Sequence, residues 1–202
     1  MMGLWLAAAP LVLASGSAVR RALLEAAGIP VEVRPASIDE RAIEAAAPRD
    51  DPSAVAAVLA REKALRIAAE LPGRLVVGAD QTLVLGSRRF DKPADRASAR
   101  AQLQALAGRT HALHSAVAVA RSGDVLFEQV GVARLTVRSL NEEFLDRYLN
   151  AAGVAVTASV GAYQLEAFGV HLFERVEGDH FTILGLPLLP LLAYLRSEGS
   201  LA

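Results

Sequence analysis

Short apolar runs and helical periods alternate along the first half of the chain. The run Pro10–Ala14, with Leu11, Val12 and Leu13 at its centre, predicts a short buried strand, and the Ser-Gly-Ser turn at 15–17 leads into a helix that stops at Gly28. The segment Val31–Arg34 has the pattern of a second strand. Apolar residues then recur at helical spacing over 52–70, which predicts a long helix.

Glycine and proline divide the second half in the same way. Leu75–Val77 predicts an apolar strand bounded by Gly78, and Thr82–Leu85 predicts a separate strand after it. The remaining pattern predicts hairpins and helices, namely the hairpins 111–120 with 125–137 and 170–176 with 180–183, and the helices 93–106, 141–148 and from Pro187 onward.

Strands and helices are intermixed over the whole length, and no repeat, low-complexity segment or long linker divides the chain. Hairpins form antiparallel pairs, whereas helical crossovers join parallel strands. We therefore expect the α/β class, with a mixed twisted sheet and flanking helices. We expect residues 1–202 to form a single domain.

Two apolar stretches resemble membrane segments. Met1–Ala14 lacks a basic leader and is too short to span a bilayer, which favours a buried first strand over a signal peptide. Pro187 and Pro190 interrupt the apolar stretch 183–195, which favours a core-packed final helix over an anchor. These patterns predict a soluble, cytoplasmic protein that does not bind a membrane.

Composition excludes several kinds of protein. Hydrophobic residues make up 53% of the chain, which excludes disorder and allows a sizeable core. A net charge of -1 argues against a nucleic-acid-binding surface. The chain has no cysteine, which excludes disulfides, thiolate metal sites and a cysteine nucleophile.

Lysine is rare although basic residues are common. Of the 21 Lys and Arg residues, only Lys63 and Lys92 are lysines. A compact ammonium suits a crowded phosphate site, whereas a guanidinium is wider. Both lysines are therefore candidate polyphosphate contacts, and chance retention is the alternative.

The turn after the first strand is a candidate anion site. Backbone N–H groups of such a turn, with a helix N-terminus behind them, favour an anion. Ser15 and Ser17 add hydroxyl donors, and Arg20 adds a bidentate guanidinium. The alternative is an ordinary Ser N-cap with surface arginines.

Acidic residues follow two of the predicted strands. Asp80 is expected at the carboxyl end of an apolar strand, where ligand sites of α/β folds gather, and could hold a metal or activate water. Asp39 and Glu40 could supply a metal ligand or a cap, and the alternative for Asp80 is an ordinary turn residue. The four histidines lack metal-site spacing, and His111 and His114 would face opposite sides of a strand.

These candidates share one theme. Arg20, Lys63 and Lys92 are cations, and Glu40 and Asp80 are carboxylates. A triphosphate carries about four negative charges, which several cations and a metal can offset at close range. The combination predicts a site for a polyphosphate with a divalent metal.

The same residues resemble the Maf family of nucleoside triphosphate pyrophosphatases, first named for inhibition of septum formation. The resemblance extends from about Leu11 to Arg196. Its motifs occur in the order and spacing of that family, and they are Leu13-Ala-Ser-x-Ser-x-x-Arg20-Arg21, Ile38-Asp-Glu40, Arg61-Glu-Lys-Ala64, Gly78-Ala-Asp-Gln81, Lys92-Pro93, Gly108-x-x-His111 and Gly185-Leu-Pro187.

The resemblance implies a Maf/Ham1-like α/β fold with two lobes around a cleft, and usually a homodimer. It implies hydrolysis between the α- and β-phosphates, giving a nucleoside monophosphate and pyrophosphate, with Mg²⁺ or Mn²⁺ as cofactor. Asp80 matches the family's catalytic residue, the general base and a metal contact, and Glu40 matches an acidic position near the metal. Four residues match phosphate-binding positions, namely Ser15, Arg20, Lys63 and Lys92.

Three further positions bear on the choice of base. Gln81 replaces the Thr of the dTTP/UTP-preferring branch, and Glu166 replaces a Gln of that branch. Both changes resemble the branch that prefers 7-methyl-GTP, and a carboxylate can pair with the N1–H and amino edge of guanine. Val19, where the best-known subfamilies have Arg or Trp, cannot stack on a cationic base as Trp would.

Two other functions stay open at this point. One is a nucleotide-binding regulator of septum formation or cell division without significant turnover, which tight binding without hydrolysis would favour. The other is an inosine or xanthosine triphosphate pyrophosphatase of the Ham1 type, which shares fold and reaction. The Ser-x-Ser-x-x-Arg-Arg turn argues against the second, and relative rates on ITP would decide.

Overall fold

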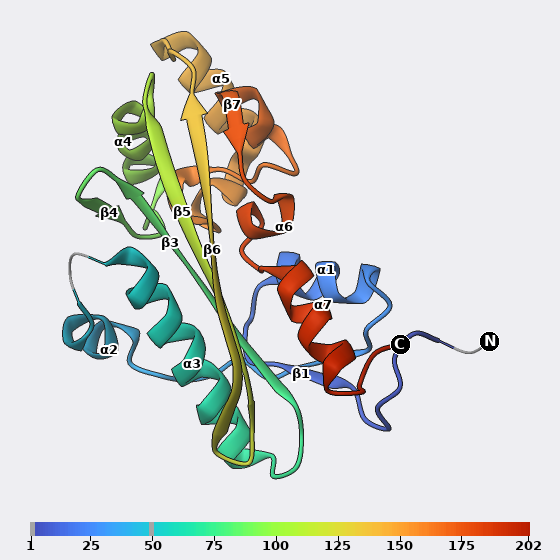
Figure 1. Ribbon diagram of the computed structural model, residues 1–202. Helices are drawn as coiled ribbons and strands as arrows, with labels where there is room; N and C mark the ends of the chain where they lie inside the picture. Colours follow the sequence, from blue (N-terminus) through green and yellow to red (C-terminus); the bar gives the residue numbers. More distant parts are fainter. Residues whose placement is uncertain (1–2, 49–50) are drawn as a thin grey trace. The chain divides into compact units, whose positions relative to one another are not determined.

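A mixed sheet with flanking helices forms the structure, a computed structural model that describes residues 3–48 and 51–202. Seven strands of the described chain pair in the order β2-β1-β3-β5-β6-β7, with β4 paired to β3 (Figure 1). The predicted α/β class and mixed sheet are confirmed. Met1 and Met2, which begin the apolar N-terminal stretch, lie outside the described residues.

The chain folds into two compact units. Unit 1 comprises Met1–Gln81, Ser115–Gly131 and Gly185–Ala202, and unit 2 comprises Thr82–His114 and Val132–Leu184. Three long strands contribute residues to both units, namely β3 (Val76–Leu85), β5 (Thr110–Arg121) and β6 (Asp124–Val137). The predicted pairing of β5 with β6 is confirmed. The expectation of a single domain over residues 1–202 stays a prediction.

Unit 1 contains the parallel part of the sheet. Strand β1 (Leu11–Leu13) pairs in parallel with β2 (Val31–Val33) and with β3. Its helices are α1 (Ala18–Ala26), α2 (Glu40–Ala46), α3 (Pro52–Glu70) and α7 (Leu188–Ser197). All of these were predicted except α2, whose seven residues carry no helical period long enough to detect.

Small residues bring α3 onto the sheet of unit 1. Val12 of β1 and Ala14, which directly follows the strand, contribute to a buried cluster that includes Ala60 and Ala64 of α3. The short alanine side chains allow a close approach of helix and strand backbones. Figure 1 shows α3 on one side of these strands and α1 with α7 on the other.

Strand β3 runs without interruption from Val76 to Leu85, so the prediction of two strands separated at Gly78 is wrong. Gly78 does not end a strand. A Cβ built there would lie 2.1 Å from the Ala60 oxygen and 2.6 Å from the Ala64 nitrogen of α3. The glycine therefore serves close helix packing, and Asp80 lies within the strand rather than after its end.

Unit 2 contains shorter elements around its own core. They are β4 (Arg88–Phe90), α4 (Arg96–Leu106), α5 (Glu142–Ala152), three 3-10 helices η1 (Gly153–Thr157), η2 (Val160–Ala162) and η3 (Phe168–Leu172), β7 (Phe173–Glu177) and α6 (His180–Ile183). Helix α4 begins at Arg96 rather than at the predicted Pro93, because Asp95 caps it by accepting from the Ser98 N–H at 2.7 Å. The pattern did not reveal β4, which has three residues.

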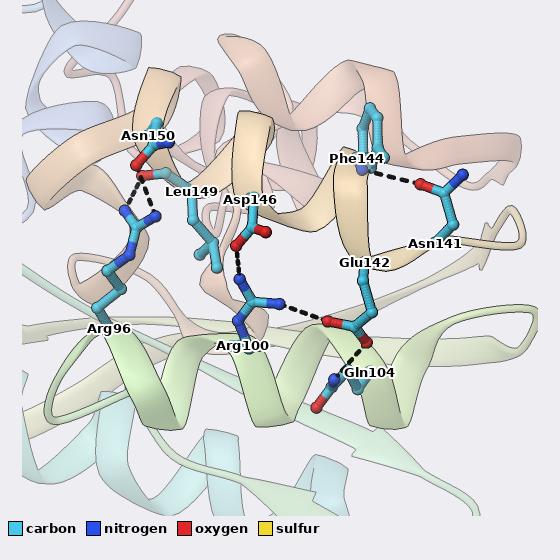
Figure 2. A network of polar contacts seen from close by, with 9 residues as sticks. All are labelled: Arg96, Arg100, Gln104, Asn141, Glu142, Phe144, Asp146, Leu149 and Asn150. Carbon is cyan, nitrogen blue, oxygen red and sulfur yellow. Dashed lines mark hydrogen bonds and ion pairs between the residues drawn. The ribbon is translucent and has the colours of Figure 1, made fainter.

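Polar side chains join α4 to α5 (Figure 2). Arg100 forms ion pairs with Asp146 and, at 2.6 Å, with Glu142. Arg96 donates to the Leu149 carbonyl at 2.6 Å. Because the carboxylates of these ion pairs are exposed, each contributes little to stability, and the buried leucines beneath them hold the helices together.

The predicted hairpin of 170–176 with 180–183 is wrong. Strand β7 pairs antiparallel with β6 instead, with Leu135 opposite Val176. Residues 180–183 form the short helix α6, whose N-cap Asp179 accepts from the Thr182 N–H at 2.8 Å. A segment of four residues that mixes apolar and polar side chains fits a strand and a helical turn equally well. The N-cap Asp179 favours the helical turn here.

Candidate active site

Lys63 of α3 lies between two carboxylates in unit 1. Its Nζ is 2.7 Å from Asp80 Oδ1 and 2.8 Å from Glu40 Oε1. The side chains of Lys63 and Asp80 are only 11% and 13% exposed, whereas that of Glu40 is 51% exposed. Sequence analysis named all three, and the structure brings them together.

Close packing of α3 on β3 creates this contact. Gly78 meets the backbone of Ala60 and Ala64. Asp80 follows Gly78 by two residues, so both positions share one face of the strand. Lys63 precedes Ala64 on α3 and thereby reaches the Asp80 carboxylate.

The acidic pair after β2 divides into two roles. Asp39 is the N-cap of α2, and its Oδ1 accepts from the Ala42 N–H at 3.1 Å. Glu40 opens the helix and directs its carboxylate to Lys63. The two alternatives considered for this pair, a cap and a site carboxylate, are therefore both realised, one by each residue.

The Ser-Gly turn supports Arg20. Ser17 caps α1 by accepting from the Arg20 N–H at 3.3 Å, which is the ordinary N-cap role. The buried Ser15 Oγ accepts from Arg20 Nη1 at 3.1 Å and from the Ser17 N–H at 3.3 Å. Anion binding by this turn stays a prediction.

Two carbonyl groups complete the environment of Arg20. Nη1 donates to the Ala79 oxygen at 2.8 Å, and Nε donates to the Gly185 oxygen at 2.8 Å. A side chain at residue 185, whose φ is +90°, would lie 3.4 Å from Arg20 Nη2. The Gly185-Leu-Pro motif therefore orients this arginine.

Charge and burial act in opposite directions on Arg20. Burial lowers the pKa of its guanidinium, and the neighbouring carboxylates of Asp80 and Glu40 raise it. An arginine stays protonated in proteins, so Arg20 is a fixed positive charge near the carboxylate pair.

Gln81 is oriented by a residue that sequence analysis missed. Its Nε2 donates to the Ser115 Oγ at 2.9 Å, and Ser115 is completely buried in β5. The available signal was a single serine in the otherwise apolar run 115–120. Val19 is half-buried on α1.

The other two predicted site residues belong to unit 2. Lys92 is exposed between β4 and α4, and Glu166 is exposed in the turn 165–167. The structure therefore gathers Ser15, Arg20, Glu40, Lys63, Asp80 and Gln81 in unit 1. The roles of Lys92 and Glu166 stay predictions.

The carboxylate pair fits a divalent metal that is shared with a substrate. Among residues 3–48 and 51–202, no group of three His, Cys, Asp or Glu side chains could hold a metal ion. Mg²⁺, however, binds through one or two carboxylates together with substrate phosphates, and Mn²⁺ also prefers carboxylate oxygens. Asp80 and Glu40, whose carboxylates both contact Lys63 Nζ, supply such a pair.

Carboxylates that suit a metal, together with the cations Arg20 and Lys63 that suit phosphates, are the side chains expected of a polyphosphate site. The model of the family described as "Maf-like protein" matches residues 10–198. The chain belongs to the Maf family, and the resemblance seen in the sequence is confirmed.

Named relatives match all or nearly all of the chain. A "Nucleoside triphosphate pyrophosphatase" of Rhodopseudomonas palustris (strain BisB18) is 58% identical over 100% of both chains. A "7-methyl-GTP pyrophosphatase" of Rhizobium etli is 53% identical over 95% of this chain and 97% of its own. A solved HAM1 protein from Coxiella burnetii has a TM-score of 0.41 and 15% identity, over 63% of this chain and 72% of its own, a likeness too low to define the fold.

Proposed function

We propose that this protein is a nucleoside triphosphate pyrophosphatase, which hydrolyses its substrate to a nucleoside monophosphate and pyrophosphate. The observation that carries the proposal is the contact of Asp80 and Glu40 with Lys63, beside the fixed charge of Arg20. The names of full-length relatives, such as the one from Rhodopseudomonas palustris, support it. They also favour an enzyme over a regulator without turnover.

Asp80 is the general base in this proposal. Its carboxylate takes a proton from the water that attacks the α-phosphorus. The bond between the α-phosphorus and the oxygen that bridges to the β-phosphate breaks at the same time. The leaving pyrophosphate keeps that oxygen. A divalent metal, when bound by Asp80 and Glu40, neutralises phosphate charge and polarises the phosphate oxygens.

The cations bind and orient the polyphosphate. Nε and Nη1 of Arg20 are held by neutral oxygens, and within the described chain Nη2 makes no hydrogen bond, so this nitrogen can donate to a phosphate. Lys63 supplies an ammonium and Ser15 a hydroxyl. Lys92 is proposed to add a further ammonium.

The substrate class that we propose is a non-standard or modified purine nucleotide, such as 7-methyl-GTP. The relative from Rhizobium etli bears that substrate in its name. The carboxylate of Glu166 suits the N1–H and amino edge of guanine. Gln81, like Glu166, resembles the branch of the family that prefers 7-methyl-GTP.

We further propose a homodimer that acts in the cytoplasm, with Mg²⁺ or Mn²⁺ as its cofactor. The family resemblance supports the dimer, and light scattering of the purified protein tests it. Within the described part of the chain, no helix has the length and apolar character needed to cross a bilayer.

The proposal predicts that Asp80→Asn abolishes pyrophosphate release. Loss of a general base costs about 10²- to 10⁴-fold in rate, and the metal contact is lost as well. The measurement is pyrophosphate release from a nucleotide panel that includes 7-methyl-GTP, GTP, dTTP, UTP and ITP, with Mg²⁺ or Mn²⁺.

Asp124→Asn is the matched control, because Asp124 is an exposed aspartate at the start of β6. It should keep wild-type activity. Equal activity of Asp80→Asn and wild type, with contaminating enzyme excluded, would remove Asp80 from the mechanism.

A further inference from the structure

The ammonium of Lys63 makes its polar contacts with the two proposed metal ligands. Within the described chain its ion pairs are those with Asp80, at 2.7 Å, and with Glu40, at 2.8 Å. The side chains of Lys63 and Asp80 are largely buried, so water screens their contact only weakly, whereas the half-exposed Glu40 carboxylate is screened more. The same carboxylate lone pairs would bind a divalent cation.

Arg20 is held differently. Its side-chain hydrogen bonds go to the Ser15 hydroxyl and to the carbonyl oxygens of Ala79 and Gly185. All three acceptors are neutral. Arg20 therefore does not compete with a metal for either carboxylate, whereas Lys63 does.

We propose that Lys63 is an exchangeable counterion of the site: it neutralises Glu40 and Asp80 while no nucleotide is bound, and it transfers to the polyphosphate on binding, which frees both carboxylates for the metal. This inference rests on the proposed function, since it concerns the same substrate and the same ligands. In addition, the transfer of Lys63 to the polyphosphate comes before both carboxylates bind the metal.

Electrostatics explains the exchange. Glu40 and Asp80 would repel one another if a partly buried site held no cation between them. One ammonium offsets one of the two charges, and a divalent ion offsets both, but the ion must displace Lys63 and lose water. A triphosphate with about four negative charges offers Lys63 a stronger partner.

Reciprocity follows from linkage. If a bound nucleotide makes metal binding easier, then bound metal strengthens nucleotide binding by the same factor. Lys63 is the physical link between the two ligands, because it contacts the carboxylates in one state and the phosphates in the other. A metal without a nucleotide should therefore bind weakly.

The first experiment measures Mn²⁺ binding without nucleotide, from the electron paramagnetic resonance signal of free Mn²⁺. Lys63→Gln should bind Mn²⁺ about tenfold more tightly than wild type, within the range of coupled binding sites. Arg66→Gln is the matched control, because Arg66 is on the same helix and pairs with Glu70 at 3.1 Å in an exposed position. It should change the affinity by less than about twofold, because solvent and salt screen exposed charges.

The double variant Lys63→Gln with Asp80→Asn tests whether the tighter Mn²⁺ binding of Lys63→Gln depends on the Asp80 carboxylate. It should lose the tighter Mn²⁺ binding, because one carboxylate ligand is gone. If Lys63→Gln binds Mn²⁺ no more tightly than wild type, or if the double variant keeps the gain, the inference is wrong.

The second experiment uses the wild-type chain and does not depend on how Lys63 variants fold. The chain has two lysines, so a sample with ¹³C- and ¹⁵N-labelled lysine gives two side-chain ammonium signals, and Lys92→Arg assigns them. A GTP analogue with a methylene group between the α- and β-phosphates, added in metal-free buffer, should shift the Lys63 signal. An unchanged Lys63 signal at saturating analogue overturns the inference.

Failure of the inference is distinguishable from failure of the proposed function. Pyrophosphate release by wild type tests the function alone. Active wild-type enzyme with no gain of Mn²⁺ affinity in Lys63→Gln would leave the pyrophosphatase in place and remove the exchange. Absence of pyrophosphate release from every nucleotide would remove the function itself.

Discussion

At the scale of single residues, His111 illustrates a buried polar group that serves the fold. Its side chain is 1% exposed, and its Nε2 lies 2.7 Å from the Tyr163 hydroxyl. Within the described chain its Nδ1 has no hydrogen-bond partner. Burial lowers the pKa of His111 to about 4. This role agrees with the lack of metal-site spacing among the four histidines of the sequence.

Protonation of His111 should destabilise the protein in acid. The usual pKa is 6.5 and the folded value is about 4, so the unfolded chain binds more protons between these pH values. Stability should therefore decrease as pH falls from about 6.5 to 4, by about 3 kcal/mol from this residue. Urea unfolding of wild type and His111→Gln at pH 7 and pH 4.5 measures the difference.

His171→Gln provides the control, because His171 is exposed. It should show the same acid destabilisation as wild type. An equal acid destabilisation in His111→Gln and wild type would contradict the assignment to His111.

At the scale of elements, the contact of α3 with β3 determines the site. Gly78 was interpreted from sequence as the end of a strand, because glycine usually weakens strands. A sequence pattern cannot distinguish a strand end from a position where a helix backbone approaches, since both require a missing side chain. The structure shows the second case, and Asp80 consequently faces α3 from inside β3.

Gly78→Ala should disrupt this contact. The new Cβ would meet backbone atoms of Ala60 and Ala64 at 2.1 and 2.6 Å, and backbone atoms cannot rotate away. We expect a loss of about 3 kcal/mol in the free energy of unfolding, at the upper end of overpacking effects. Urea denaturation measures it, and pyrophosphate release should decrease together with stability.

Gly16→Ala, in the turn between β1 and α1, is the matched control. Its Cβ would have Pro35 Cγ as nearest neighbour at 3.8 Å, which is ordinary contact. It should lose less than about 1 kcal/mol, as substitutions without a clash do. A similar loss in both variants would contradict the close-approach role of Gly78.

At the scale of the whole molecule, the predicted functional residues are divided between the two units. The carboxylates, Lys63 and Arg20 belong to unit 1, whereas Glu166 belongs to unit 2. Asp80, Glu40, Lys63 and Arg20 should therefore alter turnover of every nucleotide, whereas Glu166 should alter the preference among nucleotides.

Glu166→Gln should shift preference away from guanine-type bases, because an amide would replace the carboxylate proposed to accept two hydrogen bonds from guanine. A lost charge-assisted pair changes the ratio of kcat/KM values by about tenfold. Pyrophosphate release from 7-methyl-GTP, GTP, dTTP and UTP measures that ratio. Glu174→Gln, an exposed glutamate of β7, should leave it unchanged. Unchanged ratios in Glu166→Gln would exclude this residue from base recognition.

The sequence by itself determined the class of fold, most helices and strands, and which residues are candidates for the chemistry. Hydrophobic periodicity records which face of an element is buried, and Lys63 stood out because lysine is rare in this chain. Only the tertiary structure decided what these residues touch. The Lys63 contact with Glu40 and Asp80 joins residues that are distant in sequence, and Ser115 and the Gly185 carbonyl act through such contacts too. Local patterns cannot encode these pairs, because packing of separate elements creates them.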